Sequence, residues 1–154
     1  MDAEQLKKMY LFEGLDDDGI AKIAAICKEE NFKAGDRIFS EGDKGDKLYM
    51  VISGEVRISK MIPGIGEEAL AMLKEGTFFG EMALVDDIER STHAIANKST
   101  RCATISRADF EQLLFVDEKI ATPILWTFVR TLSSRLRETN EKIKAFFAMS
   151  GPFK

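Results

Sequence analysis

Residues 31–105 consist of short apolar segments separated by glycine-containing turns, and this pattern narrows the choice of folds. Leu48–Ile52 is a nearly continuous apolar run, whereas Val56 and Ile58 alternate with polar residues, as in strands with one solvated face. Gly-Asp and Ser-Gly pairs separate these segments and favour turns, and Pro63–Gly66 predicts a hairpin connection. Several short strands at turn spacing predict an antiparallel sandwich or barrel. Further strands are expected at residues 69–73, 93–96 and 101–105.

Helices are predicted on both sides of this β-region. In the N-terminal segment, apolar side chains recur at helical spacing in two stripes, with breaks expected at Gly14 and Gly19. After the β-region, Ser106 and Asp109 match the N-cap and N3 positions of a capping box, which predicts a helix through Phe115. The predicted organisation is one α+β domain, residues 1–154, with N-terminal helices (1–30), an antiparallel β-barrel (31–105) and C-terminal helices (106–148).

The last helix carries a second apolar stripe. Pro123 either starts this helix, with Thr122 as the N-cap, or kinks a helix that began near Asp117. Apolar residues alternate four and three positions apart along it, which is the spacing of a coiled-coil seam and predicts a parallel homodimer. The seam consists of Leu125, Val129, Leu132, Leu136, Thr139, Ile143 and Phe146. The side chains expected to pack against the chain's own barrel instead are Trp126, Phe128 and Phe147.

Composition and charge exclude several classes of function. A formal net charge of -4 and a pI near 5.2 argue against DNA as a partner, because nucleic-acid-binding domains usually carry a basic face. No window approaches the ~20 apolar residues of a membrane span and no signal peptide is recognisable, so the cytoplasm is expected. Cys27 and Cys102 form no CxxC pair and are predicted to be small buried hydrophobes. His93 is the one histidine, so the usual metal site of a cupin enzyme is excluded.

Residues 78–94 combine a glycine, a short apolar helical turn and an arginine, and this combination predicts an anion-binding site. Gly80 lets the backbone approach a ligand with no Cβ in the way, and Met82–Val85 can form one helical turn with free N–H groups. Such a turn attracts phosphate, and Arg90 could close over the same anion. Glu81 remains as an acceptor for a hydroxyl. A hydroxyl acceptor beside a phosphate donor indicates a ribose phosphate.

Phe79–Leu84, followed by Glu89–Ser91, resembles the phosphate-binding cassette of the cyclic nucleotide-binding domain family. The resemblance covers nearly the whole chain and is strongest to the family's bacterial cAMP-dependent transcription activators. It implies a jelly-roll barrel, a dimer through the long helix and a regulatory function with no chemical step. In that family the arginine pairs with the phosphate oxygens and the glutamate takes the ribose 2′-hydroxyl, and these roles fall on Arg90 and Glu81. The phosphate and ribose contacts implied are Gly80, Glu81, Met82, Ala83, Arg90 and Ser91.

The resemblance also implies how the base is recognised. In the activators a threonine and the next residue of the long helix contact adenine from the two subunits, and these positions are Thr139 and Asn140 here. Asn140 replaces a serine, and its amide can both donate and accept. Ser91 after Arg90 favours cAMP, whereas Thr92, if a β-bulge redirected it, would favour cGMP. We therefore expect cAMP as the ligand, with cGMP as the alternative.

Ligand binding would bridge the cassette and the long helix and so shift the arrangement of that helix. The activators continue into a DNA-binding domain, but residues 149–154 are too short for one, and Gly151 and Pro152 are expected to end the helix. Either the chain is a stand-alone receptor that signals to a separate protein, or it is a fragment of a longer one. The alternative function is a dimeric interaction scaffold of the same fold that binds no nucleotide.

Overall fold

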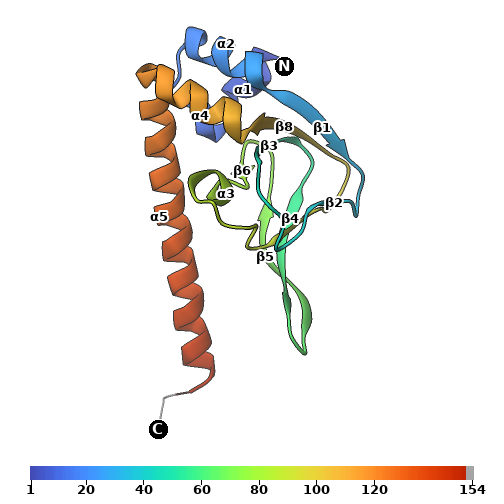
Figure 1. The fold of residues 1–154 in the computed structure, drawn as a ribbon. Coiled ribbons are helices and arrows are strands. Elements are labelled where there is room, and N and C mark those ends of the chain that lie inside the picture. The colour runs from blue at the N-terminus through green and yellow to red at the C-terminus, as the bar shows by residue number, and fades with distance from the viewer. Residues whose placement is uncertain (152–154) are drawn as a thin grey trace.

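The computed structural model describes residues 1–151 and arranges them as two four-stranded sheets with helices before and after them (Figure 1). The strand orders are β1-β8-β3-β6 and β2-β7-β4-β5, and the strand pairs are antiparallel. Helices α1 (Ala3–Lys7), α2 (Asp17–Ile26) and α4 (Arg107–Val116) lie at one end of the sheets, and α5 (Glu118–Met149) runs down one side (Figure 1). The predicted α+β fold class is therefore confirmed. The strands are β1 (Lys28–Phe32), β2 (Arg37–Phe39), β3 (Lys47–Ser53), β4 (Val56–Ile62), β5 (Gly66–Leu73), β6 (Phe78–Phe79), β7 (His93–Ala96) and β8 (Thr100–Ser106).

The β4–β5 hairpin projects from the sheets in the same direction as the C-terminal part of α5 (Figure 1). Its predicted turn at Pro63–Gly66 is confirmed, with Gly64 at a φ of +80° and Gly66 at +107°. These values lie in the region that favours glycine. Leu70 is skipped in the pairing with β4, so it forms a β-bulge on the edge strand β5.

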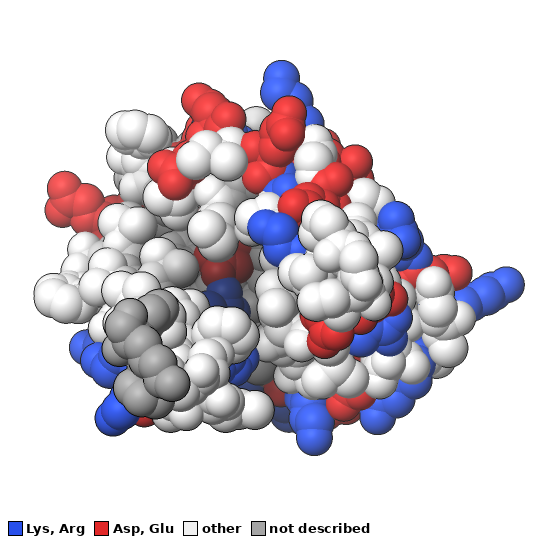
Figure 2. All heavy atoms as spheres, turned by 90° about the horizontal axis from the view of Figure 1, so that it is seen from below, with Lys and Arg blue, Asp and Glu red and all other residues white. Residues whose placement is uncertain are grey.

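A hollow opens between the C-terminal part of α5 and the hairpin when the molecule is seen from below (Figure 2). Acidic and basic side chains both lie deep inside it in this view. Lys142 of α5 spans the separation between helix and hairpin, because its Nζ donates to the carbonyl of Leu70 at 3.1 Å. The helix and the edge strand are thus linked by a polar contact at the bulge.

Helix α5 (Glu118–Met149) begins before Pro123, which lies inside the helix. Asp117 is the N-cap, and its side chain accepts a backbone N–H of the first turn at 3.1 Å, so the alternative start with Thr122 as N-cap is wrong. A Cβ at Gly14 would lie only 2.8 Å from the Cβ of Pro123. Gly14 therefore allows the N-terminal segment to approach the helix closely. The helix ends at Met149, and Gly151 follows the C-cap Ser150 with a φ of +78°, as predicted, whereas Pro152 falls outside the described residues.

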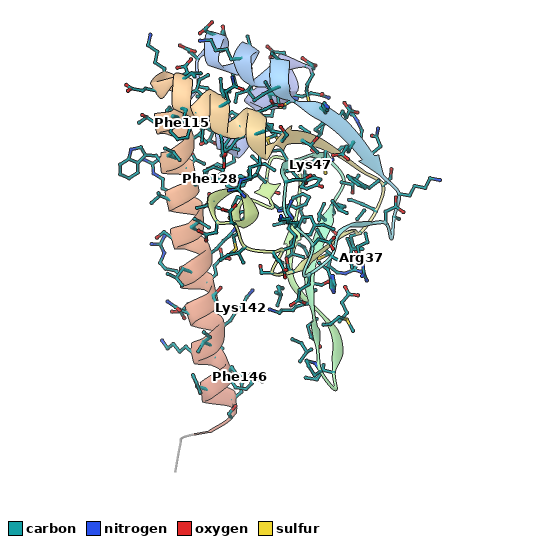
Figure 3. The ribbon with its side chains drawn as sticks, in the orientation of Figure 1. Arg37, Lys47, Phe115, Phe128, Lys142 and Phe146 are labelled. Carbon is teal, nitrogen blue, oxygen red and sulfur yellow. The ribbon has the colours of Figure 1, made fainter. Side chains whose placement is uncertain are left out.

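The aromatic side chains of α5 divide between two environments. Phe128, labelled in Figure 3, is buried and lies edge-on to Phe78 and Phe110, with ring centroids 5.3 and 5.9 Å away, as predicted. Trp126 and Phe147 are 57% and 45% exposed, so the prediction that they pack against the barrel is wrong. Trp126 precedes Phe128 by two residues, about 200° around an α-helix, and both side chains cannot face the same sheet.

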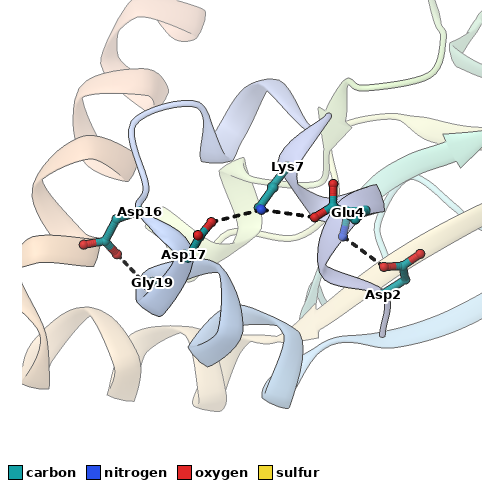
Figure 4. Close-up of polar contacts among 6 residues, drawn as sticks. All are labelled: Asp2, Glu4, Lys7, Asp16, Asp17 and Gly19. Atoms are coloured by element: carbon teal, nitrogen blue, oxygen red, sulfur yellow. Dashed lines mark hydrogen bonds and ion pairs between the residues drawn. The ribbon is translucent and has the colours of Figure 1, made fainter.

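The N-terminal helices pack in the larger core cluster, and capping bonds and an ion pair occur at their surface (Figure 4). They are α1 (Ala3–Lys7), η1 (Tyr10–Phe12) and α2 (Asp17–Ile26). Asp16 caps α2 by accepting the N–H of Gly19 at 2.8 Å, so Gly19 belongs to the first turn and the predicted break there is wrong. Lys7 lies 2.9 Å from Asp17 and joins α1 to α2. Strand β1 starts at Lys28, inside the segment expected to be helical.

Two buried clusters form the core. The larger lies among the helices and one sheet, and it includes helix α4 (Arg107–Val116), whose predicted cap is confirmed because Ser106 accepts the N–H of Asp109 at 3.2 Å. The smaller, called the inner cluster here, consists of Phe39, Tyr49, Val51, Val56, Phe79, Ala94 and Cys102. Cys27 lies in the larger cluster, and burial raises the pKa of both thiols to about 12. The two cysteines are buried hydrophobes, as predicted.

Candidate functional site

The turn between β6 and the short helix α3 (Met82–Val85) brings the backbone against a guanidinium. Gly80 lies in this turn with a φ of +82°, which favours glycine. A Cβ at Gly80 would be 2.7 Å from Nη1 of Arg90, closer than real Cβ contacts allow. The helical turn begins at Met82, as predicted. A side chain at Gly80 would therefore displace the arginine.

Arg90 is almost fully enclosed, with 5% of its surface exposed. Its Nη1 donates to the carbonyl of Gly80 at 2.7 Å, and its Nη2 donates to that of Lys47 at 2.8 Å. The guanidinium carbon lies 4.3 Å from the ring centre of Phe39, so the cation stacks on the inner cluster. Burial lowers the pKa of Arg90 from its ordinary value. Arginine stays charged even so, and the site holds a buried positive charge.

The backbone of Arg90 is held by the loop between β2 and β3. The carbonyl of Arg90 accepts the N–H of Gly42 at 2.8 Å, and the N–H of Arg90 donates to the carbonyl of Asp43 at 2.7 Å. A third bond fixes this loop, because the N–H of Glu41 donates to Nδ1 of His93 at 3.0 Å. Both the guanidinium and the main chain of Arg90 are therefore constrained by backbone groups distant in sequence.

Glu81 is paired with an arginine that sequence analysis did not identify. Its carboxylate is 3% exposed and forms an ion pair with Nη1 of Arg135, while Nη2 of Arg135 donates to the carbonyl of Phe78 at 3.0 Å. Arg135 belongs to α5, so its ion pair with Glu81 links the cassette to the long helix. The available signal was its spacing, since Arg135 lies two turns after Phe128 on the face of α5 that packs inward.

The other predicted site residues lie around this centre with different exposures. Met82 is 57% exposed, and Ala83 is part of α3. Ser91 is exposed and Thr92 half-buried, just before β7. The structure thus brings Gly80, Glu81 and Arg90 together with Arg135.

The two predicted base-contacting residues lie on α5, beyond Arg135. Thr139 and Asn140 are both exposed, and the hydroxyl of Thr139 donates to the carbonyl of Arg135 at 2.9 Å. Asn140 also borders a cavity of about 650 Å³ that follows α5. The cavity is lined by Ser134, Arg137, Glu138, Asn140, Glu141 and Lys142. Neither Glu81 nor Arg90 borders it, because all of its lining residues belong to α5.

Two kinds of feature are absent from the residues that the structure describes. Among residues 1–151, no group of three or more histidine, cysteine, aspartate or glutamate side chains is placed to hold a metal ion. Within the same residues, no helix has both the length and the apolar character needed to cross a membrane.

Comparison with known proteins places these residues in a defined family. The family model for the cyclic nucleotide-binding domain matches residues 29–117, more than half of the chain. The cyclic AMP receptor protein of Thermus thermophilus is 33% identical over 135 residues, which cover 88% of this chain and 61% of that protein. The cGMP-dependent protein kinase egl-4 of Caenorhabditis briggsae is 33% identical over 111 residues, 71% of this chain and 15% of the kinase.

Solved structures agree with this assignment. The crystal structure of a cyclic nucleotide-binding domain from Methylobacillus flagellatus superposes with a TM-score of 0.82 and 28% identity, covering 94% of this chain and 81% of that one. The chain spans between 14% and 61% of the length of the curated relatives it matches.

Proposed function

The chain belongs to the cyclic nucleotide-binding domain family, and we propose that it is a regulatory module that binds cAMP at the cassette and performs no chemical step. The observation that carries the proposal is the buried guanidinium of Arg90 against the carbonyl of Gly80. A buried positive charge is matched by an anion, and guanidinium pairs with phosphate through two parallel hydrogen bonds.

Binding exchanges contacts that the cassette already makes. The two terminal nitrogens of Arg90 donate to neutral carbonyls at 2.7 and 2.8 Å, and a phosphate oxygen is a stronger, charged acceptor. The stacking on Phe39 is compatible with this exchange because it uses the face of the guanidinium and leaves its edge for the ligand. The phosphate of the nucleotide would lie beside Gly80, where the lack of a Cβ gives it room.

The ribose would meet Glu81. Its carboxylate is buried and accepts from Arg135, and a carboxylate has further lone pairs for a 2′-hydroxyl. A 2′-hydroxyl that donates to Glu81 would alter the ion pair between Glu81 and Arg135, and Arg135 is part of α5. Ligand binding therefore biases the position of the long helix, with a coupling typically of ~1 to 3 kcal/mol.

The base is assigned to the exposed residues Thr139 and Asn140 of α5 and, on the cassette side, to Ser91 and Thr92. A relative named as a cyclic AMP receptor protein and one named as a cGMP-dependent protein kinase both match this chain, so cGMP is the second candidate ligand. Ser91 directly after Arg90 favours cAMP. Asn140 would reach the base of the neighbouring subunit, which requires a dimer.

The seam of α5 supports that dimer. Its six apolar side chains are between 38% and 66% exposed. Such a continuous apolar stripe is stabilised when a second helix covers it, and the alternating spacing fits another copy of the same helix. A separate downstream protein would read the resulting change in helix position, in the cytoplasm, where cyclic nucleotides act as signals.

A calorimetric titration of the refolded protein, freed of carried-over nucleotide, with cAMP and then cGMP tests the proposal. One saturable site per chain with tighter binding of cAMP supports it, and tighter binding of cGMP reassigns the ligand. Absence of heat and of any thermal shift with both ligands would leave a dimeric interaction scaffold as the function.

Arg90→Ala is the matching variant, and it should weaken cAMP binding by about 3 kcal/mol, because a charge-assisted contact to a partly buried phosphate is lost. Arg101→Ala is the control, since Arg101 is a surface arginine paired with Glu29 at 2.9 Å. Equal affinities of both variants in the titration would refute the cassette assignment.

A further inference from the structure

His93 is a buried side chain to which the proposed nucleotide contacts give no role. It opens β7 and is 8% exposed. The next residue, Ala94, belongs to the inner cluster, and successive side chains of a strand point to opposite faces of the sheet. His93 therefore faces away from the cluster on which Arg90 stacks, and any effect on the ligand has to pass through its neighbours.

The ring of His93 acts as a hydrogen-bond acceptor. Its Nδ1 accepts the backbone N–H of Glu41 at 3.0 Å. A ring nitrogen that accepts carries no proton, so this contact requires the neutral imidazole with its proton on Nε2. Protonation of Nδ1 would place two donors face to face and break the bond.

The loop that His93 holds also holds Arg90. Gly42 and Asp43 follow Glu41 directly, and they make the two backbone hydrogen bonds to Arg90 at 2.8 and 2.7 Å. The same loop is closed on itself, because the N–H of Ser40 donates to the side chain of Asp43 at 2.9 Å. A change at Glu41 is therefore transmitted over one or two residues to the main chain of the phosphate-binding arginine.

We infer that His93 is a positioning residue for Arg90, and that protonation of His93 releases the loop and weakens binding of the cyclic phosphate. The inference rests on the proposed function of the cassette. It makes ligand affinity fall as the solution becomes more acidic, since histidine is the side chain that ordinarily changes charge between pH 5 and 8.

The charged groups around His93 are already engaged. Glu41 lies 3.5 Å from Lys60 of β4, and Glu67 of β5 lies 2.7 Å from Arg57. The hydrogen bond from Arg57 holds the pKa of Glu67 below its ordinary value. On β2, Arg37 donates to the hydroxyl of Ser40 at 3.3 Å. Because its pKa is lowered, the carboxylate of Glu67 stays charged over the range in which histidine ordinarily titrates, so its own charge does not change there.

Calorimetric cAMP titrations at about pH 8 and about pH 5.5 test the inference on the whole chain. The wild type should bind about threefold to tenfold more weakly at the lower pH, the range expected when one hydrogen bond is lost. His93→Asn keeps a neutral acceptor close to the position of Nδ1, and its affinity should stay near the wild-type value at the higher pH and not change between the two. His93→Phe removes the acceptor, and it should bind weakly at both pH values.

Three results would overturn the inference: a wild-type affinity that does not depend on pH, a His93→Asn variant that keeps the wild-type dependence, or a His93→Phe variant that binds like the wild type at the higher pH. Glu41→Gln is the control, because it removes the charge next to Lys60 but keeps the backbone N–H, and it should retain the dependence.

Amide NMR without nucleotide separates this inference from the proposed function. The resonances of Glu41, Gly42 and Arg90 should shift together as His93 is protonated, and they should not shift in His93→Asn. Amide resonances that do not shift as the imidazole of His93 is protonated would refute the positioning role. Failure to bind cAMP at either pH, with the amides still coupled, would instead refute the proposed function.

Discussion

The two halves of α5 are attached to the domain in different ways. The first half buries Ile120, Ile124 and Phe128 in the larger core cluster. The second half exposes its apolar side chains and contacts the β-region through Arg135, bound to Glu81 and the carbonyl of Phe78, and through Lys142. Buried apolar contacts hold a helix in place whether or not a ligand is bound, whereas polar contacts can be replaced by contacts to a ligand. The half that can respond is therefore the half attached to Glu81, the proposed contact of the ribose.

The largest effect expected from this difference is on stability. Phe128→Ala should lower the free energy of unfolding by about 4 kcal/mol, since a fully packed aromatic ring leaves a cavity. Phe146→Ala, the matched change in the second half, should cost under about 0.5 kcal/mol at protein concentrations where the chain is monomeric. Urea unfolding measures both. Similar losses for the two variants would contradict the distinction between the halves.

The second half should in turn carry the association of two chains. Leu132→Asp combined with Leu136→Asp should weaken the dimer by roughly 3 kcal/mol or more, because two carboxylates would be buried in the seam, while the domain stays folded. Sedimentation velocity measures the change. Arg130→Asp with Lys144→Asp adds the same number of carboxylates off the seam and should leave the dimer intact. A dimer that survives in the first variant would move the interface elsewhere.

A smaller effect is expected at the link between cassette and helix. Arg135→Ala should weaken cAMP binding by about 2 kcal/mol, because the buried carboxylate of Glu81 loses the partner that holds it in place. The advantage of cAMP over 2′-deoxy-cAMP should shrink in this variant. Arg137→Ala, two residues further on and bonded to Ser133, is the control in the same titration. An unchanged preference for the 2′-hydroxyl would separate Arg135 from ribose recognition.

The smallest effect concerns the base. Thr139→Ala and Asn140→Ala should each cost about 1 kcal/mol of cAMP affinity, the net value of one hydrogen bond, and less for cGMP. Competition between the two nucleotides measures this difference directly. Equal losses for both ligands would assign base recognition to Ser91 and Thr92 in place of the helix.

Sequence reasoning succeeded where the determinants were local. The cassette turn at Gly80, the cap at Ser106 and the hairpin at Pro63–Gly66 each follow from a few adjacent residues, and the structure confirms them. The prediction at Gly19 was wrong because the sequence alone does not distinguish a glycine in the first turn of a helix from one that ends a helix.

The contacts that sequence reasoning missed join distant parts of the chain. Arg135 is 54 residues from Glu81, so its spacing after Phe128 places it on the inward face of α5 but does not identify Glu81 as its partner. The role of Gly14 depends on the ring of Pro123 packing against it. Trp126 shows the opposite error, because an aromatic residue off the seam was assumed to be buried although the inward face was already filled by Phe128.

The burial of both native thiols has a practical consequence. Cys27 and Cys102 are 9% and 0% exposed, and burial raises the pKa of each to about 12, so at neutral pH they supply almost no thiolate. A cysteine introduced on the exposed side of α5 and another at the hairpin tip would then react with maleimide labels ahead of the native pair. The natural chain is thus already suited to spectroscopic measurement of how far the helix moves when a nucleotide is added.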